Sequence, residues 1–241
     1  MAQRPAVILL AFGDQHDPLA GRLLLMGFRA LRAHGPAAVR PLLGRDAGPV
    51  RGMIIASSPE GMSLAELTSG LRTALEGGVS FEMVANGPRP GRGALDALRQ
   101  LGVRHCLWTP HNDSELRFIL NRVVYEGPGA LRGDARVPTD MMVRVHSAAG
   151  EKPALVYNLS ASGAFLETHR PTNVGGHIRM CLPLPTGPIE TSAVVVAANV
   201  PGNLQRPNLP RGMGIRFEKL DASQRETIEK YIHERAGTYE L

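Results

Sequence analysis

The chain of 241 residues is long enough for one large or two small domains, and 43% of its residues are hydrophobic, as in ordinary globular proteins. It contains no apolar run of about eighteen residues, and its N-terminus is a poor signal peptide, so we expect a cytoplasmic protein with no membrane insertion. The net charge is +5, but aromatic residues make up only 5% of the chain and no basic run occurs, which argues against nucleic acid as a partner.

The charge is divided unevenly along the chain. Residues 1–125 carry 14 basic and 10 acidic side chains, whereas residues 126–241 carry 13 and 12. The C-terminal half is close to neutral, so any attraction of an anionic ligand there has to be local. The basic excess of the N-terminal half could serve an acidic partner surface, although a solvated charged face is the simpler interpretation. Cys106 and Cys181 fall in different predicted domains, which indicates reduced thiols and neither a disulfide nor a metal site.

Short apolar runs alternate with helical patterns through residues 1–126. The predicted strands are Ala6–Phe12, a weaker Ala37–Pro41, Met53–Ala56, Val79–Ala85 and Val103–Trp108, and the predicted helices are Leu19–Ala33, one that opens at Ser63, Ala94–Leu101 and Ser114–Val124. Ser63 and Glu66 have the spacing of a capping box, and Gly77-Gly78 would end that helix. This alternation predicts an α/β doubly wound domain with a parallel sheet covered on both faces.

The same order of elements resembles the response-regulator receiver domain. Two stretches carry the resemblance: Ile54–Met62, where that family holds its phosphorylation site, and Trp108–Pro110 before the last helix. The chemistry of a receiver is missing, however. Ala11-Phe12-Gly13 stands where receivers have the acidic pair that holds Mg²⁺, Ala56 aligns with the phospho-accepting Asp, and Thr109 aligns with the Lys. This half therefore resembles a degenerate receiver, a pseudo-receiver of flavodoxin-like fold, through which we expect an unidentified protein partner to bind.

Other enzymatic motifs are not found in this half. The first strand is followed by Gly13-Asp14-Gln15 and not by the G-x-G-x-x-G of a Rossmann domain. The prolines within Gly87–Gly93 remove amide donors that a phosphate cradle needs. Ser57 and Ser58 lack a G-x-S-x-G context and are interpreted as ordinary strand-end serines. We therefore expect a chain that is not an enzyme and has no catalytic residues.

A few acidic residues keep two alternatives open. Asp14, His16 and Asp17 lie near a strand end, where α/β ligands often bind, but helix capping and solvation explain them more simply. Phosphorylation of Asp14 or Asp46 would make the chain a phosphorylatable regulator, which stays a third hypothesis behind the two given below.

The pattern changes to strands in the C-terminal half. The predicted strands are Met142–Val145, Ala154–Leu159, Ala164–Glu167, His177–Leu184, Thr191–Val200 and Met213–Phe217, and Pro, Gly and Asn clusters separate them. This spacing predicts a small all-β antiparallel barrel. His169 and His177 are too isolated to indicate a metal.

A C-terminal helix follows the predicted barrel. Asp221 and Gln224 form a variant of the capping box at its start. Ile228, Tyr231 and Ile232 share one apolar face, which we expect to pack across the barrel.

Two arginines and an N-x-S-x-x-G turn form a candidate nucleotide site. Arg132 and Arg136 lie in a Gly-containing loop, and Asn158, Ser160 and Gly163 follow at the end of a predicted strand. A guanidinium can grip a phosphate bidentately, stack on a purine, or donate to guanine O6 and N7. Asn158 and Ser160 are two apart and share a strand face, and Gly163 is expected to adopt the positive φ that lets the chain turn. Surface arginines beside an ordinary turn are the simpler alternative.

The order and spacing of these residues resemble the signature of the PilZ domain, the receptor family for cyclic di-GMP. The flanking stretches Arg136-Val137-Pro138 and Gly212–Phe217 resemble that family as well. The resemblance implies a PilZ domain over residues 127–241. It also implies that cyclic di-GMP is the ligand, with no cofactor and no metal, and that the binding residues are Arg132, Arg136, Asn158, Ser160 and Gly163.

Two functions of different kinds follow. The first is a non-catalytic cyclic di-GMP effector that converts binding into a change of interdomain arrangement and protein–protein interaction, in bacterial motility, surface or development signalling. The alternative is a PilZ-like scaffold that binds no nucleotide and acts through its receiver-like domain. Residues Glu126–Leu131 would serve as a short hinge between the two domains.

Overall fold

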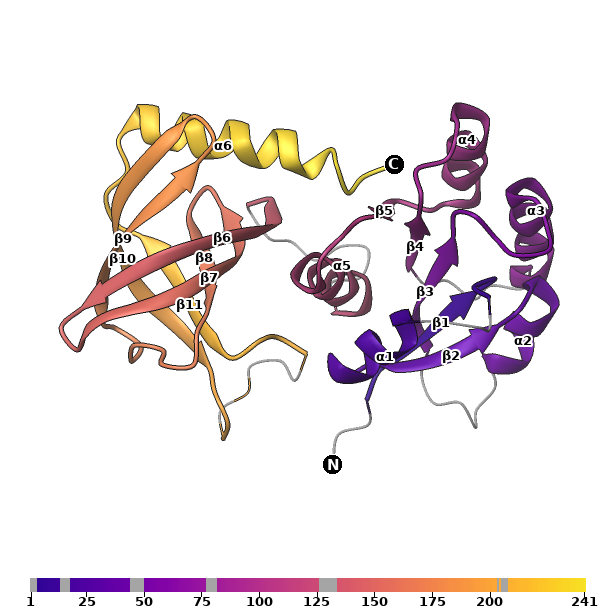
Figure 1. Cartoon of the computed structure of the whole chain (residues 1–241), viewed down its shortest axis with the longest axis horizontal. Coiled ribbons are helices and arrows are strands. Elements are labelled where there is room, and N and C mark those ends of the chain that lie inside the picture. The colour runs from indigo at the N-terminus through magenta and orange to yellow at the C-terminus, as the bar shows by residue number, and fades with distance from the viewer. Residues whose placement is uncertain are drawn as a thin grey trace. The chain divides into compact units, whose positions relative to one another are not determined.

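The computed structural model describes residues 4–13, 18–43, 50–76, 82–125, 134–202, 204 and 208–241. Contacts divide the chain into two compact units (Figure 1). The first contains Met1–Ala130 together with Tyr239–Leu241, and the second contains Leu131–Thr238. The predicted boundary between residues 126 and 127 lies outside the described residues.

The first unit is built on a five-stranded parallel sheet. Its elements are β1 (Ala6–Leu10), α1 (Pro18–Leu25), β2 (Arg29–Ala33), the 3-10 turn η1 (Pro36–Ala38), α2 (Val39–Leu42), β3 (Val50–Ala56), α3 (Leu64–Leu75), β4 (Glu82–Gly87), α4 (Arg92–Leu101), β5 (His105–Trp108) and α5 (Asp113–Tyr125). The strand order is β2-β1-β3-β4-β5, and every neighbouring pair is parallel. This order confirms the doubly wound, receiver-like fold class.

The strands are apolar because both faces of the sheet are covered. All five residues of β1 are buried, and Ile8 and Leu10 join a core cluster with residues of α3 and α4. The predicted capping box at the start of α3 is present: the Ser63 amide donates to Glu66 Oε2 at 2.7 Å, and the Glu66 amide donates to Ser63 Oγ at 3.2 Å. These two bonds satisfy amide groups that the first turn of a helix leaves without partners.

Two predictions for this unit are wrong. The helix predicted over Leu19–Ala33 ends at Leu25, and Arg29–Ala33 forms β2 beside β1. Gly27 has a φ of 84°, which stops the helix, and β2 is an edge strand whose half-exposed residues give no clear alternation. The strand predicted over Ala37–Pro41 is instead the helical segment η1–α2, because Pro36 opens a turn there and packs against Gly70 of α3.

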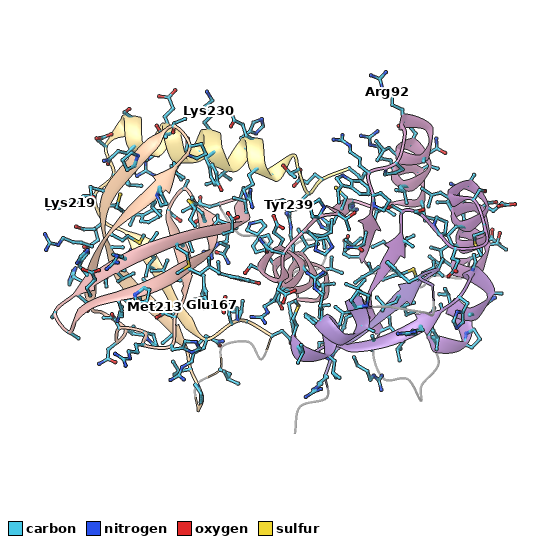
Figure 2. The ribbon with its side chains drawn as sticks, viewed as in Figure 1. Arg92, Glu167, Met213, Lys219, Lys230 and Tyr239 are labelled. Atoms are coloured by element: carbon cyan, nitrogen blue, oxygen red, sulfur yellow. The ribbon has the colours of Figure 1, made fainter. Side chains whose placement is uncertain are left out.

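The second unit is a closed barrel of six antiparallel strands with one helix. Its elements are β6 (Arg136–Ser147), β7 (Gly150–Ser160), β8 (Gly163–Glu167), β9 (His177–Leu184), β10 (Gly187–Asn199), β11 (Gly212–Phe217) and α6 (Ala222–Ala236). Neighbours around the barrel are β10-β11-β8-β7-β6-β9, and β6 pairs with β9 to close it. Met213 and Glu167 mark the neighbouring strands β11 and β8 (Figure 2). The predicted all-β barrel is confirmed.

Helix α6 packs on this barrel as its apolar face predicts. Ile228 and Ile232 are buried in the barrel core, and Tyr231 packs against it. The capping box at Asp221 is present, since the Gln224 amide donates to Asp221 Oδ1 at 2.8 Å. Near the other end of α6, Arg235 Nε donates to the carbonyl oxygen of Pro138 on β6. Among the described residues, no helix is long and apolar enough to cross a membrane.

Candidate functional site

Four cross-strand partners form a row on the barrel. Arg136 of β6 pairs with Ser160 of β7, Ser160 pairs with Gly163 of β8, and Gly163 pairs with Arg216 of β11. Directly opposed residues of antiparallel strands point to the same face of a sheet. The row therefore places two arginines on either side of a serine and a glycine, with about 14 Å between the backbones that carry the arginines.

This row lies on the outer face of the barrel. The residues next to its members in sequence are all in the barrel core: Val137, Leu159, Ala164 and Ile215. Because side chains alternate along a strand, the row must face away from that core. The adjacent row on the same face contains Asn158, Phe165 and Gly214. We call these two rows the arginine-flanked face.

Asn158 and Ser160 lie on this face, but their polar groups are largely used within the protein. Asn158 is 6% exposed, and its Oδ1 accepts a bond from Arg136 Nη1 at 3.4 Å. Ser160 is fully buried, and its hydroxyl donates to the Gly163 carbonyl oxygen at 3.1 Å, which closes the β7–β8 hairpin. The serine therefore fixes the shape of the turn, and the asparagine orients the arginine.

Gly163 is required for a different reason from the one that the sequence suggested. It does not have a positive φ, so the expectation of a left-handed turn residue is wrong. A Cβ at this position would lie 2.1 Å from the carbonyl oxygen of Ile215 on β11. The close approach of two backbones, and not the turn conformation, excludes a side chain here.

Arg216 was not predicted as a site residue. It is exposed, and within the described part of the chain its guanidinium has neither a hydrogen-bond partner nor an ion-pair partner. An unpaired guanidinium is available to an anionic ligand. The only sequence signal was its place in Gly212–Phe217, because its position opposite Gly163 depends on strand register. Arg132, the other predicted arginine, lies outside the described residues.

In the first unit, Ala11 and Ala56, which the sequence aligns with carboxylate positions of receivers, are buried at 2% and 3% exposure. Glu60 brings one carboxylate close to Gly13, because a Cβ on Gly13 would lie 2.1 Å from Glu60 Oε2. The described residues contain no cluster of three His, Cys, Asp or Glu side chains that could hold a metal ion. Asp14, His16, Asp17 and Asp46 lie outside the described residues.

A small hollow of about 220 Å³ lies at the carboxyl ends of β1, β4 and β5. Asn86 Nδ2 lies 2.7 Å from His111 Nε2, and Arg22 Nε donates to Asp113 Oδ1 at 2.6 Å. Burial lowers the pKa of His111, and the charge of Arg22 lowers it further. Among the described residues, the hollow thus brings together an imidazole and an arginine that is already paired with Asp113.

The family model described as PilZ domain matches residues 130–234. These residues form a PilZ domain. They include Arg136, Asn158, Ser160 and Gly163 of the predicted signature, as well as Arg216. No curated protein matches the chain.

Solved structures similar to the chain fall into two groups. An inhibitor of motility from Bacillus subtilis (MotI/DgrA) is 23% identical with a TM-score of 0.36, and the match covers 45% of this chain and 52% of that one, so the chain spans about half of its length. The PilZ domain of YcgR from Escherichia coli, solved with c-di-GMP, is 15% identical with a TM-score of 0.35, over 44% of this chain and 92% of that one. A response regulator receiver protein from Pseudoalteromonas atlantica is 12% identical with a TM-score of 0.42, over 52% of this chain and 100% of that one.

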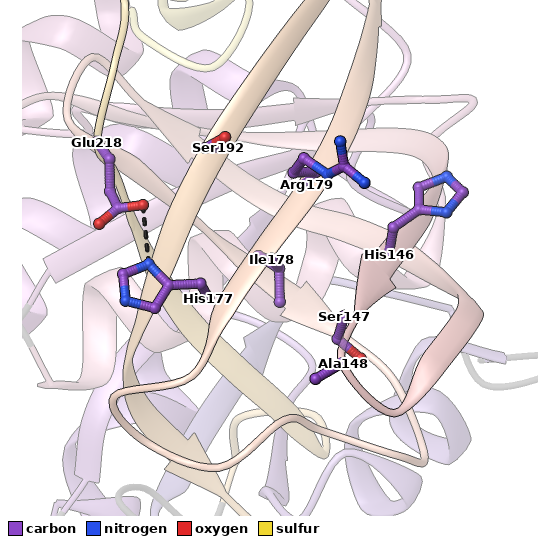
Figure 3. A pocket seen from close by; sticks show the side chains of 8 residues that line it. All are labelled: His146, Ser147, Ala148, His177, Ile178, Arg179, Ser192 and Glu218. Atoms are coloured by element: carbon purple, nitrogen blue, oxygen red, sulfur yellow. Dashed lines mark hydrogen bonds and ion pairs between the residues drawn. The ribbon is translucent and has the colours of Figure 1, made fainter.

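The PilZ domain also has a cavity away from its signature residues. It has a volume of about 440 Å³ and is lined by His146, Ser147, Ala148, His177, Ile178, Arg179, Ser192 and Glu218 (Figure 3). His177 Nδ1 lies 3.0 Å from Glu218 Oε2, so these two side chains already interact with each other. His146 is ten residues from Arg136 along β6, or roughly 30 Å. The cavity adjoins the other end of the arginine-flanked face, because Glu218 is two residues from Arg216 and His177 pairs with Val194, the cross-strand partner of Arg216.

Proposed function

We propose that the PilZ domain binds cyclic di-GMP and that the chain is a non-catalytic effector of this nucleotide. The observation that carries the proposal is the arginine-flanked face, on which Arg136 and Arg216 bracket residues with small or no side chains. Cyclic di-GMP has two phosphates and two guanines, and each offers a partner for a guanidinium. Gly214 has no side chain that would keep the ligand from approaching the backbone of the sheet.

Each residue of this face has a distinct part in the proposal. Arg136 and Arg132 clamp a phosphate and a guanine, and Arg216 neutralises the far side of the ligand. Asn158 holds Arg136 and can present its amide to a guanine edge. Ser160 and Gly163 keep the hairpin in the shape that aligns the arginines.

Binding would be converted into a change of interdomain arrangement. Arg132 directly follows the predicted hinge Glu126–Leu131, so a ligand that engages Arg132 acts next to the connection between the domains. Cyclic di-GMP can shift the equilibrium between two interdomain arrangements only by as much as its affinity for one arrangement exceeds its affinity for the other. The receiver-like domain, over residues 1–126, would then present itself differently to a protein partner, in bacterial motility, surface or development signalling.

Calorimetry with cyclic di-GMP tests the binding proposal on the full chain. We expect a dissociation constant of about 10 µM or lower. Arg136→Ala should weaken binding at least about tenfold, because it removes charge-assisted bonds. Arg225→Ala, an exposed arginine on α6, is the matched control and should bind normally. A folded chain that gives no binding heat rejects the proposal.

The second candidate is an interaction scaffold that needs no nucleotide. It is favoured by the buried Ala11 and Ala56, which provide no phosphate-accepting carboxylate at those two positions. A folded chain that binds no cyclic di-GMP would support this candidate.

A further inference from the structure

The outer edge of β5 is closed by the last residues of the chain. Glu240 pairs with His105 as an antiparallel bridge. The Cys106 amide donates to the Tyr239 carbonyl oxygen at 3.0 Å, and the Leu241 amide donates to the Arg104 carbonyl oxygen at 3.1 Å. β5 is the last strand of the sheet, so these two bonds satisfy an edge that would otherwise offer unpaired backbone groups.

The side chains of this segment, Tyr239–Leu241, make specific contacts with the first unit. The Tyr239 hydroxyl donates to Glu115 Oε1 at 2.6 Å, while Glu115 Oε2 accepts from the Asn112 amide at the start of α5. Tyr239, labelled in Figure 2, is buried, with 6% of its surface exposed. Glu240 Oε1 lies 3.7 Å from Arg122 Nη1, and Leu241 packs against the core cluster shared by the sheet, α3 and α4. Each side chain of the segment thus has a complementary partner: a carboxylate for the Tyr239 hydroxyl, a guanidinium for Glu240, and the apolar core for Leu241.

We propose that the β5 edge is a docking site for an extended aromatic–acidic–aliphatic segment, and that Tyr239–Leu241 occupies it as a detachable ligand within the same chain. Main-chain bonds to the edge give affinity, and the three side-chain contacts give specificity, as in recognition by strand addition. Docking of Tyr239–Leu241 at the β5 edge does not depend on nucleotide binding by the PilZ domain.

The occupant is detachable because it is only three residues long. Its ion pair joins side chains that are 36% and 52% exposed, so that pair contributes little. Gly237 and Thr238, both exposed, precede it. A segment of this length can open without unfolding of the sheet that it covers.

The occupant comes from the same chain because α6 delivers it. Only Gly237 and Thr238 separate the end of α6 from Tyr239. Tethering to α6 makes docking intramolecular, so a segment too short to bind alone can still fill the site. Arg235, near the end of α6, contacts Pro138, which is two residues from Arg136 on β6.

Hydrogen exchange of the Cys106 amide, followed by NMR on the full chain, tests the proposal. Leu241→Pro removes the amide that donates to Arg104, and Leu241→Val keeps it. We expect the Cys106 amide to exchange at least about tenfold faster in Leu241→Pro than in Leu241→Val, with barrel amides unchanged in both. Equal rates in the two variants would overturn the proposal.

A peptide of residues 234–241, added to a chain that lacks residues 239–241, tests the site in trans. At millimolar concentration it should slow exchange of Cys106, whereas a peptide with Tyr239→Ala and Glu240→Lys should not. Protection of the Cys106 amide by neither peptide, or by both, would contradict a site that is specific for the aromatic–acidic–aliphatic segment. If protection of the intact chain rises with protein concentration, the occupant comes from a second copy, which contradicts docking within one chain.

Discussion

At the scale of single residues, Gly163 shows how a small side chain can be required by its neighbours. Its backbone lies so close to Ile215 of β11 that a Cβ would meet the carbonyl oxygen at 2.1 Å. We predict that Gly163→Ala lowers the free energy of unfolding by about 1–3 kcal/mol, since the two strands must separate. Gly214→Ala is the control, because its Cβ would lie at an ordinary 3.5 Å from Ala197. Urea denaturation measures both, and equal stabilities would contradict the prediction.

His105 makes stability depend on pH. Burial, together with the charges of Arg122 and Arg104, lowers its pKa from 6.5 to about 4. Between these values the unfolded chain binds a proton that the folded chain does not, so the free energy of unfolding should fall as the pH drops from 6.5 to 4. The loss is on the order of 3 kcal/mol. Denaturation at several pH values should show a shallower slope for His105→Gln, and an unchanged slope would refute this origin.

Arg216 is predicted to contribute to ligand binding. Arg216→Ala should raise the dissociation constant for cyclic di-GMP about tenfold, because an unpaired guanidinium facing the ligand is lost. Arg179→Ala on β9 removes an exposed arginine that lines the cavity and is not part of the arginine-flanked face, and this variant should bind as the parent does. Calorimetry measures the dissociation constant of each variant for cyclic di-GMP. Equal dissociation constants for the two variants would show that Arg216 does not contribute to binding.

The residues of the site differ in how far they could be predicted. Arg136, Asn158, Ser160 and Gly163 form a local pattern in the sequence, and the structure places all four on one barrel face. Arg216 could not be predicted, since its position opposite Gly163 follows from the register of β8 and β11. The physical reason for Gly163 could not be predicted either, because it depends on the same strand pair.

At the scale of elements, the strongest periodic patterns were predicted correctly, and edge elements were not. β1, β3, α3, α5 and the barrel strands have apolar patterns that match their burial. β2 was not predicted because this edge strand is only partly buried, and its sequence could equally continue the helical pattern of α1. The short helical segment η1–α2 was missed because its packing on α3, and not its own propensity, determines its conformation.

Helix α6 should stabilise the barrel through its buried face. Ile228 is fully buried in the barrel core. We expect Ile228→Ala to lower the free energy of unfolding by about 2–5 kcal/mol, because it removes buried methyl groups and leaves a cavity. Glu229→Ala, the exposed neighbour, should change it by less than about 0.5 kcal/mol. Similar unfolding curves for the two variants would show that α6 does not pack as the structure has it.

At the scale of the whole molecule, two domains of different chemistry share one chain. The PilZ domain carries Arg136 and Arg216 on an outer face, and the receiver-like domain has the buried alanines Ala11 and Ala56 at the positions that the sequence aligns with receiver carboxylates. The order of the domains was predictable from the change of hydrophobic period along the sequence. The return of Tyr239–Leu241 to the first unit was not, because three residues after a helix carry no periodic signal.

Mapping of cyclic di-GMP onto the full chain by amide chemical shifts tests the central claim most directly. We predict shifts in the amides of Asn158, Gly163 and Arg216, whose strands form the arginine-flanked face, and none around His146 and Arg179. Shifts confined to the cavity of His146 and Arg179, or no shifts in a folded chain, would contradict the assignment of the nucleotide to this face.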